Sequence, residues 1–584
     1  MPDPTLAAEM QCTLIQSIEG NETLRREWNQ LVLRMEFPQV FFTWEWALAA
    51  QRAFYPAVQP WVFVFRGADE ILGIAAMAVG AGSFGKAFFL CASTADYCEI
   101  VSAPQDRAVV VHALLAELRR ANVRDVVFAN LPANSPTASA LSSSQRYGYW
   151  KATEPAFTCW QIVLGSGEAR QELKKTVARK QLEKRKLARM AKIGSVGLHH
   201  LRSFEAVAQA LPQIINAQIC RFLANGRISP LLFPERRKFI EELSTLLGPA
   251  GWLDVGELSI ANKGAAWNFG FHFSRTLFWY MPTFEVAMES LSPGSCLLRL
   301  LVEESCDQDD VDLLDLGLGD EAYKGRFANG GTSTVLIRLE ENLAAHLSTM
   351  ARQKVRAWMR RSPRAEHAFR KGWELVSRIR ERIGEQGMAA FAGSSARRML
   401  SLLASSRQVE FFEWRGNVQL STPECVVKPL DWTTLSKGAL ENSDDPETLR
   451  YLMRCAVRLQ NSDASSMQGF VLESQDASAL HFCWAADYGG FVVDELQHTL
   501  EAQTEPASVI FDCWTPVRSR GHNYYGIAVE LLARELKNRG KATWIFSGAT
   551  NQPSIRGLEK TGFVHSHAMV RRRLLLQSNV YRKG

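Results

Sequence analysis

The stretch 508–563 near the C-terminus combines residue types that could hold a phosphorylated molecule. Arg518, Arg520 and Gly521 lie in a polar turn between an apolar run, Val509 to Phe511, and an amphipathic segment that continues to Asn538. The first amides of a helix have no intrahelical partner, and with the helix dipole and two guanidinium groups they favour a phosphate or pyrophosphate. Taken alone, the turn is equally compatible with an ordinary strand-to-helix loop.

A second group of reactive residues lies in a glycine-rich loop after an apolar run, and it brings acids, a phenol and cations within reach of one another. In acyl transfer a carboxylate can deprotonate the attacking group while a Lys or Arg holds an anionic group. A solvated, salt-bridged loop is the alternative. The candidates in this loop are Asp320, Glu321, Tyr323, Lys324 and Arg326.

Asn551-x-x-Ser554, followed by Glu559-Lys560-x-Gly562-Phe563, resembles the closing signature of the GNAT acetyltransferases. The resemblance covers roughly residues 469–575 and implies that the Arg/Gly turn is the pyrophosphate loop of an acetyl-CoA site. The implied donor-binding residues are Arg518, Arg520, Gly521, His522, Asn523, Asn551 and Ser554. Asp494 and Glu495, expected to end the third strand of this unit, are candidate bases, with exposed loop acids as the alternative.

The chain departs from the family pattern at two places. The family loop reads R/Q-x-x-G-x-G/A, whereas this chain offers Arg518-x-x-Gly521-x-Asn523 or Arg520-x-x-Asn523-x-Tyr525, each without at least one small residue. The family often places a Tyr general acid seven residues after the Asn, and that position here is Leu558. A proton donor must therefore come from elsewhere.

Residues 25–340 resemble the acetyltransferases of bacterial cellulose and exopolysaccharide synthesis, which are tandem GNAT-fold proteins related to the Fem-type aminoacyltransferases. Leu316 to Gly319 stand where this family often has a Phe and an Arg. The resemblance implies a saccharide or cell-envelope acceptor, contacted by Tyr280, Tyr323, Lys324 and Arg326. It rests on Trp61 to Val79, Asp96-Tyr97, the basic helix from Leu173, Tyr280-Met-Pro, Ser292-Pro293-Gly294 and Asp315-x-Gly-x-Gly-Asp320-Glu-x-Tyr323-Lys324-x-Arg326-Phe327.

One hairpin design occurs three times and predicts the architecture. Its copies begin at Trp61, Leu253 and Gly469, and the third is expected to continue into a third strand at 490–496. Each copy is followed by helix and strand patterns, which favours an α/β fold of three GNAT-like units with mixed, mostly antiparallel sheets flanked by helices. The expected domains are 1–165, 166–340, a basic helical linker at 341–405, and a C-terminal acetyltransferase domain at 406–584.

Two basic segments bear on partners. Residues 170–192 contain ten Lys or Arg against two acids, with a thin apolar stripe, and predict a basic helix. A solvated face is the default. A phosphorylated or undecaprenyl-type donor, an anionic bilayer or RNA are the alternatives. The second run, 352–382, is expected to be part of the linker. The stripe comprises Leu173, Val177, Leu182, Leu187 and Met190.

The composition narrows the class of protein. The chain has 584 residues, a net charge of +6 and 11 Cys without a Cys-x-x-Cys pair, so neither a metal site nor nucleic acid is expected. Without an apolar run of about 18 residues, a soluble cytoplasmic protein is expected, with peripheral contact to an anionic inner-membrane surface or a polysaccharide synthase left open. The predicted activity is acyl-CoA-dependent N- or O-acyl transfer, and the alternatives are a transferase using charged tRNA and a non-catalytic scaffold.

Overall fold

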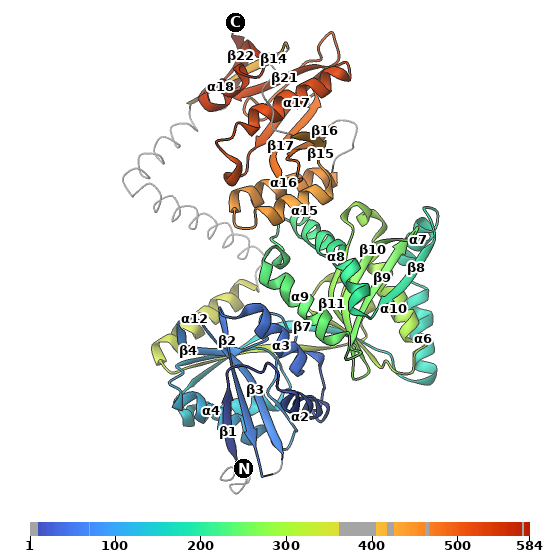
Figure 1. The fold of residues 1–584 in the computed structure, drawn as a ribbon, viewed down its shortest axis with the longest axis vertical. Coiled ribbons are helices and arrows are strands. Elements are labelled where there is room, and N and C mark those ends of the chain that lie inside the picture. The colour runs from blue at the N-terminus through green and yellow to red at the C-terminus, as the bar shows by residue number, and fades with distance from the viewer. Residues whose placement is uncertain are drawn as a thin grey trace. The chain divides into compact units, whose positions relative to one another are not determined.

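The computed structural model describes residues 10–68, 70–360, 404–416, 425–461, 467–574 and 577–583. The chain forms two compact parts (Figure 1). One part, here called the tandem pair, comprises Met1–Ala217 and Phe233–Arg361, and the other comprises Gln218–Leu232 and Ser362–Gly584 and contains the C-terminal unit. Among the described residues, no helix is both long and apolar enough to cross a membrane.

The first unit of the tandem pair follows the predicted hairpin with a third strand, a crossover helix and a parallel strand. Its elements are β1 (Gln11–Ile15), α2 (Glu22–Leu33), η1 (Val40–Phe42), α3 (Trp44–Phe54), β2 (Val58–Arg66), β3 (Ile71–Gly80), β4 (Ser83–Phe89), β5 (Val101–Ser102), α4 (Arg107–Arg120), β6 (Asp125–Pro132), α5 (Pro136–Ala140), η2 (Leu141–Tyr147) and β7 (Trp150–Val163).

The second unit repeats this plan after two basic helices. Its elements are α6 (Gly167–Ala178), α7 (Gln181–Met190), β8 (Val196–Leu201), α8 (Phe204–Ala224), α9 (Pro234–Leu247), β9 (Leu253–Ile260), β10 (Lys263–Phe273), β11 (Thr276–Phe284), η4 (Val286–Leu291), α10 (Pro293–Ser305), β12 (Leu313–Leu318), α11 (Ala322–Phe327), β13 (Gly330–Glu340) and α12 (Leu343–Arg360). The end of α8 from Gln218 and the short helix η3 (Pro230–Leu232) belong to the other part.

The C-terminal unit is the third copy. Its elements are β14 (Ala404–Trp414), β15 (Val426–Pro429), α15 (Trp432–Glu441), α16 (Pro446–Asn461), β16 (Met467–Glu473), β17 (Ala479–Asp487), β18 (Val492–Val493), β19 (His498–Thr499), β20 (Ala507–Trp514), η5 (Val517–Ser519), α17 (Tyr524–Asn538), β21 (Ala542–Gly548), α18 (Gln552–Glu559), β22 (Phe563–Leu574) and β23 (Gln577–Lys583).

The three units share one pairing pattern, which confirms the predicted fold class. In each unit three successive strands pair antiparallel, and the third then pairs in parallel with the strand that follows a helix. The parallel pairs are β4 with β6, β11 with β12, and β20 with β21. A parallel pair needs a crossover connection, and α4, α10 and α17 supply it. The fold is therefore mixed α/β with mostly antiparallel sheets.

The two units of the tandem pair share a single sheet. Its strand order is β1-β2-β3-β4-β6-β13-β7-β12-β11-β10-β9-β8. The last strand of the second unit, β13, thus lies between β6 and β7, the two closing strands of the first, while the end of β7 pairs with β12. Segments of both units consequently meet along this seam, which places first-unit loops beside second-unit strands.

Two sequence expectations about individual elements are wrong. The third strand of the C-terminal unit is β20, whereas 490–496 contains only the two-residue strand β18, because β20 carries the continuous buried run Ser508–Phe511 and pairs with β17. The basic segment 170–192 forms two helices, α6 and α7, separated by a break at residues 179–180. Most of the linker predicted at 341–405, and of the basic run 352–382, lies outside the described residues; α12 is its described part. The predicted domain boundaries remain predictions.

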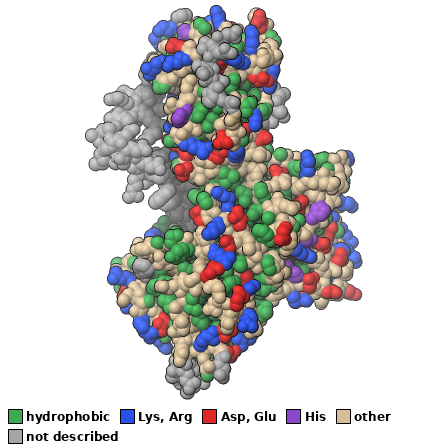
Figure 2. Space-filling model, in the orientation of Figure 1, with side chains coloured by type: hydrophobic (Ala, Val, Ile, Leu, Met, Phe, Trp, Pro, Cys, Tyr) green, Lys and Arg blue, Asp and Glu red, His purple; other side chains and the backbone are tan. Residues whose placement is uncertain are grey.

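The basic helices α6 and α7 pack most of their apolar stripe against the tandem pair, and some of their cations bond to it. Leu173, Val177, Leu187 and Met190 pack into the core around α10, whereas Leu182 is exposed. Lys174 pairs with Asp307 at 2.5 Å, and Arg170 donates to the carbonyl of Gln308 at 2.6 Å. On the face shown in Figure 2, basic and acidic side chains are interspersed rather than gathered by sign.

Candidate active site

A gap opens in the C-terminal unit where its two parallel strands stop pairing. β20 and β21 are paired from Ala507 with Ala542 to Ile510 with Ile545, and no further. Beyond this point a cavity of about 820 Å³ lies between the strands, lined by residues 511–515 of β20 and its following loop and by residues 545–548 of β21. Parallel strands of one sheet normally remain paired, so a local feature of β20 must end the pairing.

That feature is a β-bulge at Asp512. Phe482 pairs with Trp514 and Trp484 with Phe511, so β20 has one extra residue there, and Asp512 has a φ of 46°. A bulge bends its strand and leaves backbone groups without ladder partners. Helix α16 holds the bulge, because the Tyr451 hydroxyl donates to the Asp512 carbonyl at 2.8 Å and Arg458 forms an ion pair with its carboxylate.

The structure brings most of the predicted donor-binding residues to this cavity. Arg520, Gly521 and Asn523 line it from the loop before α17, and Asn551 and Ser554 line it from the start of α18. Gly521 and Asn523 both have positive φ, 88° and 58°, which turns the loop into the first turn of α17. The first amides of this 15-residue helix therefore begin at the cavity wall.

Two predicted donor-binding residues do not line the cavity. Arg518 forms an ion pair with Glu441 at 2.5 Å, and His522 is exposed with its ring 5.6 Å from that of Tyr524. The guanidinium carbon of Arg520, in contrast, lies 5.3 Å from the centre of the Trp514 ring. The distance from this guanidinium to the Glu447 carboxylate is 3.5 Å, longer than that between Arg518 and Glu441. Of the two arginines proposed for the pyrophosphate, the structure places only Arg520 in the cavity wall.

Two cavity residues were not identified from the sequence. The Tyr525 hydroxyl is hydrogen-bonded to the Ser554 hydroxyl at 2.8 Å, and burial raises the pKa of Tyr525 well above its usual value. His481 on β17 shares a hydrogen bond of 2.8 Å with Thr515, and burial lowers its pKa to about 3. Tyr525 therefore keeps its proton and His481 stays neutral near pH 7. Leu558, at the position of the family's Tyr, is fully buried in the core.

A second cavity, of about 660 Å³, adjoins the first. Glu495, Phe511, Asp512 and Phe546 line both cavities, whereas Asp494 lines only the second. Asp494 and Glu495 are exposed and have no ion-pair partner among the described residues. Of the two predicted bases in this unit, the structure places Glu495 at the junction of the cavities. The second cavity therefore offers carboxylates to an acceptor.

In the second unit the equivalent gap contains a side chain from the first unit. β11 and β12 are paired as far as Phe278 with Asp315. Beyond this pair, Gly317 lies so close to Asp96 that a Cβ atom added to the glycine would be 2.3 Å from the Asp96 carboxylate. Asp96 accepts a hydrogen bond from the Leu318 backbone, and burial followed by the charge of Asp315 raises its pKa to about 7. The Tyr280 hydroxyl also donates to the Thr94 carbonyl at 2.6 Å. Residues 94–97 thus occupy this gap.

The predicted reactive loop of the second unit surrounds this contact. Lys324 is 4% exposed, pairs with Glu321 at 3.0 Å and donates to the Leu318 carbonyl at 2.7 Å. Asp320 is exposed and accepts a hydrogen bond of 3.0 Å from Trp160. The other two loop candidates are also engaged within the chain: the Tyr323 hydroxyl accepts from Trp279 at 3.0 Å, and Arg326 lies 3.8 Å from Glu183. The loop is therefore salt-bridged and hydrogen-bonded, which was the alternative stated for it.

Asp315, at the start of this loop, is buried and fully hydrogen-bonded. Its carboxylate accepts from Tyr97 at 2.9 Å, from Gln161 at 2.9 Å and from the Gly317 amide at 2.8 Å. Burial raises its pKa, and these three donors oppose the rise. Because the carboxylate is held on every side, it serves to join the first unit to the second along the seam.

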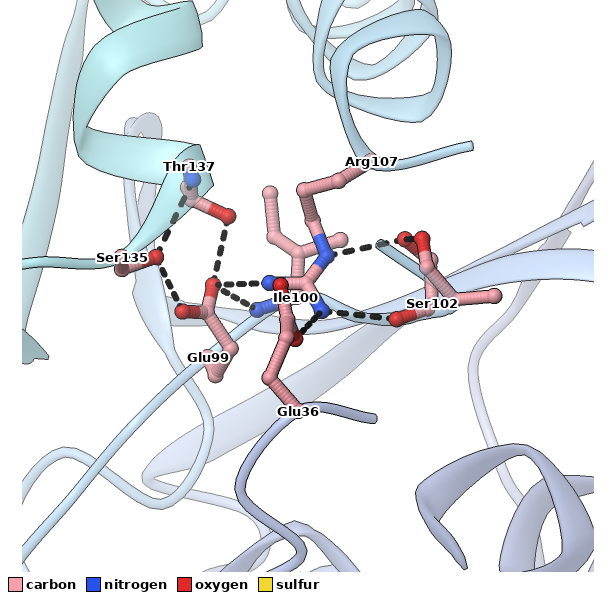
Figure 3. A network of polar contacts seen from close by, with 8 residues as sticks. Glu36, Glu99, Ile100, Ser102, Arg107, Ser135 and Thr137 are labelled. Carbon is pink, nitrogen blue, oxygen red and sulfur yellow. Dashed lines mark hydrogen bonds and ion pairs between the residues drawn. The ribbon is translucent and has the colours of Figure 1, made fainter. Parts of the chain in front are cut away.

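In the first unit a second carboxylate from the same loop lies beside the start of the crossover helix α4 (Figure 3). Glu99 accepts from Thr137 at 2.5 Å, from the Ile100 amide at 2.8 Å and from Ser135, and it pairs at 3.3 Å with Arg107, the first residue of α4. Arg107 is 1% exposed and also lies 3.3 Å from Glu36. The cation at this helix start is therefore already neutralised by the chain itself.

The C-terminal cavity fits an acyl-CoA by its own construction. It combines a bulged strand, the start of a long helix, and Arg520 at the wall. In the second unit Asp96 lies in the equivalent gap, and in the first unit Glu99 pairs with Arg107 at the start of the crossover helix. Among the described residues, no cluster of three or more His, Cys, Asp or Glu could hold a metal ion.

Comparison with protein families gives one match. Residues 178–325 match the family model described as "Acetyltransferase (GNAT) domain". The match falls on the second unit of the tandem pair, whereas the closing signature in the sequence lies in the C-terminal unit. A search of curated proteins found no match to this chain.

Solved structures give only distant likenesses. FemX is 8% identical, with 58% of this chain and 99% of that chain covered and a TM-score of 0.41. The C-terminal domain of a putative lysylphosphatidylglycerol synthetase from Agrobacterium fabrum is 14% identical, covering 57% and 95%, with a TM-score of 0.36. A tandem GNAT protein from the clavulanic acid biosynthesis pathway is 13% identical, covering 57% and 99%, with a TM-score of 0.34. At these scores the likenesses support no inference about activity.

Proposed function

We propose, on the premise that this chain is a GNAT-type acyltransferase, that it transfers an acetyl group from acetyl-CoA to an amine at the C-terminal unit. The observation that carries the proposal is the cavity between β20 and β21, which is open where the equivalent gap of the second unit contains Asp96. In the first unit Glu99 already pairs with the cation at the start of the crossover helix. The bound thioester supplies an activated acyl group, and the chain supplies binding, orientation and proton transfer.

Donor binding is assigned to the loop before α17 and to the strand gap. Arg520 and the first amides of α17 hold the pyrophosphate, since cations and helix N-termini both favour phosphate oxygens. Asn551 and Ser554 line the same cavity beside the strand gap and are assigned to the pantetheine arm. The bulge at Asp512 leaves backbone groups that can orient the acyl carbonyl.

Proton transfer is assigned to Glu495 and Tyr525. Glu495 lies at the junction of the two cavities and takes the proton of an acceptor ammonium, so that a neutral amine attacks. Tyr525, which keeps its proton because burial raises its pKa, gives it to the sulfur as the carbon–sulfur bond breaks, and the second proton lost by the attacking nitrogen restores the phenol. His481, neutral because burial lowers its pKa to about 3, acts as a polar wall residue rather than as the base.

The acceptor is proposed to be an amine-bearing saccharide or cell-envelope precursor. The second cavity offers the unpaired carboxylates of Asp494 and Glu495, which favour a cationic group over a neutral hydroxyl or an anion. The saccharide class rests on the resemblance of residues 25–340 to the exopolysaccharide acetyltransferases. Cytoplasmic localisation, with peripheral contact to an anionic membrane or a polysaccharide synthase, is part of the same proposal.

Two alternatives receive less support. A transferase that uses charged tRNA needs a free basic surface, yet Arg170 and Lys174 bond to the tandem pair's own carbonyl and carboxylate. A purely structural role for the whole chain does not account for the open cavity of the C-terminal unit.

The test is turnover of acetyl-CoA by the full chain, measured as released thiol, with glucosamine and glucose as a matched pair of acceptors. The amine is expected to react and the alcohol not. Glu495→Gln should lower turnover about 100-fold or more, whereas Asp494→Asn, which alters only the second cavity, should have a smaller effect. Turnover of Glu495→Gln equal to that of the native chain would overturn the role of Glu495, and equal reaction of both sugars would overturn the amine acceptor.

A further inference from the structure

A third cavity, of about 480 Å³, lies in the tandem pair and is not used by the proposed reaction. The segment 35–42 forms one side, and the loop 132–136 and the strands β7, β12 and β13 form the others. It contains Arg107 from the start of α4 and Ser135 from the start of α5. In the C-terminal unit the starts of α17 and α18 also line the donor cavity, but that cavity lies between two parallel strands, whereas the third cavity is lined by β7, β12 and β13.

The walls of this cavity are mostly apolar. Met35, Phe42, Pro132, Pro136, Val163 and Leu313 are among its lining residues. Val163 is 49% exposed at the end of β7, so the cavity is reached from the surface there. A concave site of this size with apolar walls and few polar groups is typical of small-molecule binding.

The charges of the wall exclude an anion. Three carboxylates, Glu36, Glu99 and Asp312, line the cavity with a single guanidinium, Arg107. Asp312 is paired with Arg275 at 2.5 Å, which leaves Glu36 and Glu99 opposite the one cation of the wall. Arg107 is already shared between Glu99 and Glu36, each at 3.3 Å, and it also donates to the Ser102 carbonyl at 2.6 Å. Phosphate or carboxylate groups consequently meet net negative charge here, in contrast to the donor cavity with Arg520.

We infer that the tandem pair holds a second ligand site, distinct from the acyl-CoA site, for a molecule with an apolar body and no negative charge. Like the donor cavity, the site is lined by the first residue or residues of a crossover helix. Here the carboxylate of Glu99 pairs with the cation at that helix start, so that the site disfavours anions. The inference does not depend on the proposed reaction, because it concerns binding in the absence of acetyl-CoA.

The experiment compares two fluorescent probes that differ by one sulfonate: N-phenylnaphthylamine, which is neutral and has an N–H group, and anilinonaphthalenesulfonate, which is anionic. Each is titrated into the full chain and into two variants that place Trp at an exposed strand Val. Val163→Trp blocks the third cavity, and Val426→Trp, at a residue 48% exposed on β15, is the control.

The neutral probe is expected to bind the native chain and Val426→Trp equally and Val163→Trp at least about 10-fold more weakly, and the anionic probe should bind the native chain at least about 10-fold more weakly than the neutral one. Glu99→Gln, if it folds, should narrow the difference between the probes. No saturable binding of the neutral probe, equal binding by Val163→Trp and the native chain, or equal affinities for both probes would each overturn the inference.

Discussion

In the C-terminal unit β20 and β21 separate after Ile510 and leave a cavity of about 820 Å³, whereas in the tandem pair Asp96 lies in the strand gap of the second unit and Glu99 pairs with the helix-start cation of the first. The three units share one strand and helix plan, so the plan does not decide which unit binds a donor. The difference comes from one loop, residues 94–99, which supplies a carboxylate to each unit of the tandem pair. A match to the family over 178–325 therefore identifies a fold, and the open gap identifies the candidate site.

The contrast between the C-terminal unit and the tandem pair is tested most severely by filling the cavity between β20 and β21. Gly548 lies in the cavity wall, has no positive φ, and an added side chain there meets no atom within 4 Å. Gly548→Trp should therefore fill the cavity without strain and remove detectable turnover of acetyl-CoA. Gly85→Trp, where an added side chain is likewise unobstructed, is the matched control in the tandem pair. Full activity of Gly548→Trp would show that the reaction occurs elsewhere.

Removing the carboxylate of Glu99 tests what this group contributes to the stability of the first unit. Glu99→Gln leaves Arg107, 1% exposed, without its buried partner. Breaking a buried pair in this way costs about 3–5 kcal/mol of unfolding free energy, measured by denaturant unfolding. Glu22→Gln, at an exposed pair with Arg25, is the control and should change the unfolding free energy by less than about 1 kcal/mol. A similarly small change for Glu99→Gln would show that this carboxylate does not stabilise the first unit.

The proton donor assigned to the open gap can be tested by removing one oxygen. Tyr525→Phe should lower kcat about 100-fold and change KM little, because the hydroxyl acts on the departing sulfur. Tyr451→Phe removes a hydroxyl that bonds to the Asp512 carbonyl and tests whether the bulge alone accounts for the loss. Equal kcat for the native chain and Tyr525→Phe would contradict the assignment.

The two arginines near α17 are expected to differ, although the sequence favours both. Arg520→Ala should weaken acetyl-CoA binding about 10-fold, because a charge-assisted contact with the pyrophosphate is lost. Arg518→Ala should change the affinity less than about 3-fold, since Arg518 is paired with Glu441 outside the cavity wall. Calorimetric titration of acetyl-CoA into both variants measures the two affinities. Equal losses of affinity would support the pyrophosphate-binding role predicted for Arg518.

A further prediction concerns His481, whose folded pKa of about 3 lies below its ordinary value of 6.5. The unfolded chain therefore binds more protons between these values, and stability falls as the pH is lowered from 6.5 towards 3. The slope from this residue is about 1.4 kcal/mol per pH unit. His481→Gln should lose this part of the pH dependence in denaturant unfolding, and an unchanged dependence would contradict the burial of a neutral imidazole.

The sequence was most informative where local pattern and structure coincide. The sequence pattern correctly located the three hairpins and the turn before α17. It also correctly placed Asn551 at the start of a helix. The third strand of the C-terminal unit was placed wrongly at 490–496, because an isolated apolar run does not show which strand it pairs with. Helix α6 and helix α7 were merged for a similar reason, since a continuous basic composition conceals a short break.

The remainder of the site depends on contacts between residues distant in the chain. Tyr525 could have been noticed from its place in the first turn after Asn523, but nothing local shows that it faces Ser554. Asp96 was quoted only as part of a resemblance, and its place beside Gly317 follows from the shared sheet that brings the first unit to the second. Glu99 carries no sequence signal, because its partners Arg107, Ser135 and Thr137 lie up to 38 residues away.

The most direct test of the account is hydrogen exchange of the full chain with and without acetyl-CoA. Protection is expected in 512–525 and 545–557, which surround the open gap, and none is expected in 94–107, 135–137 or 315–327, where the chain's own carboxylates lie. Protection of the tandem pair at these segments, with none in the C-terminal unit, would contradict the central claim that the donor binds only where the gap is open.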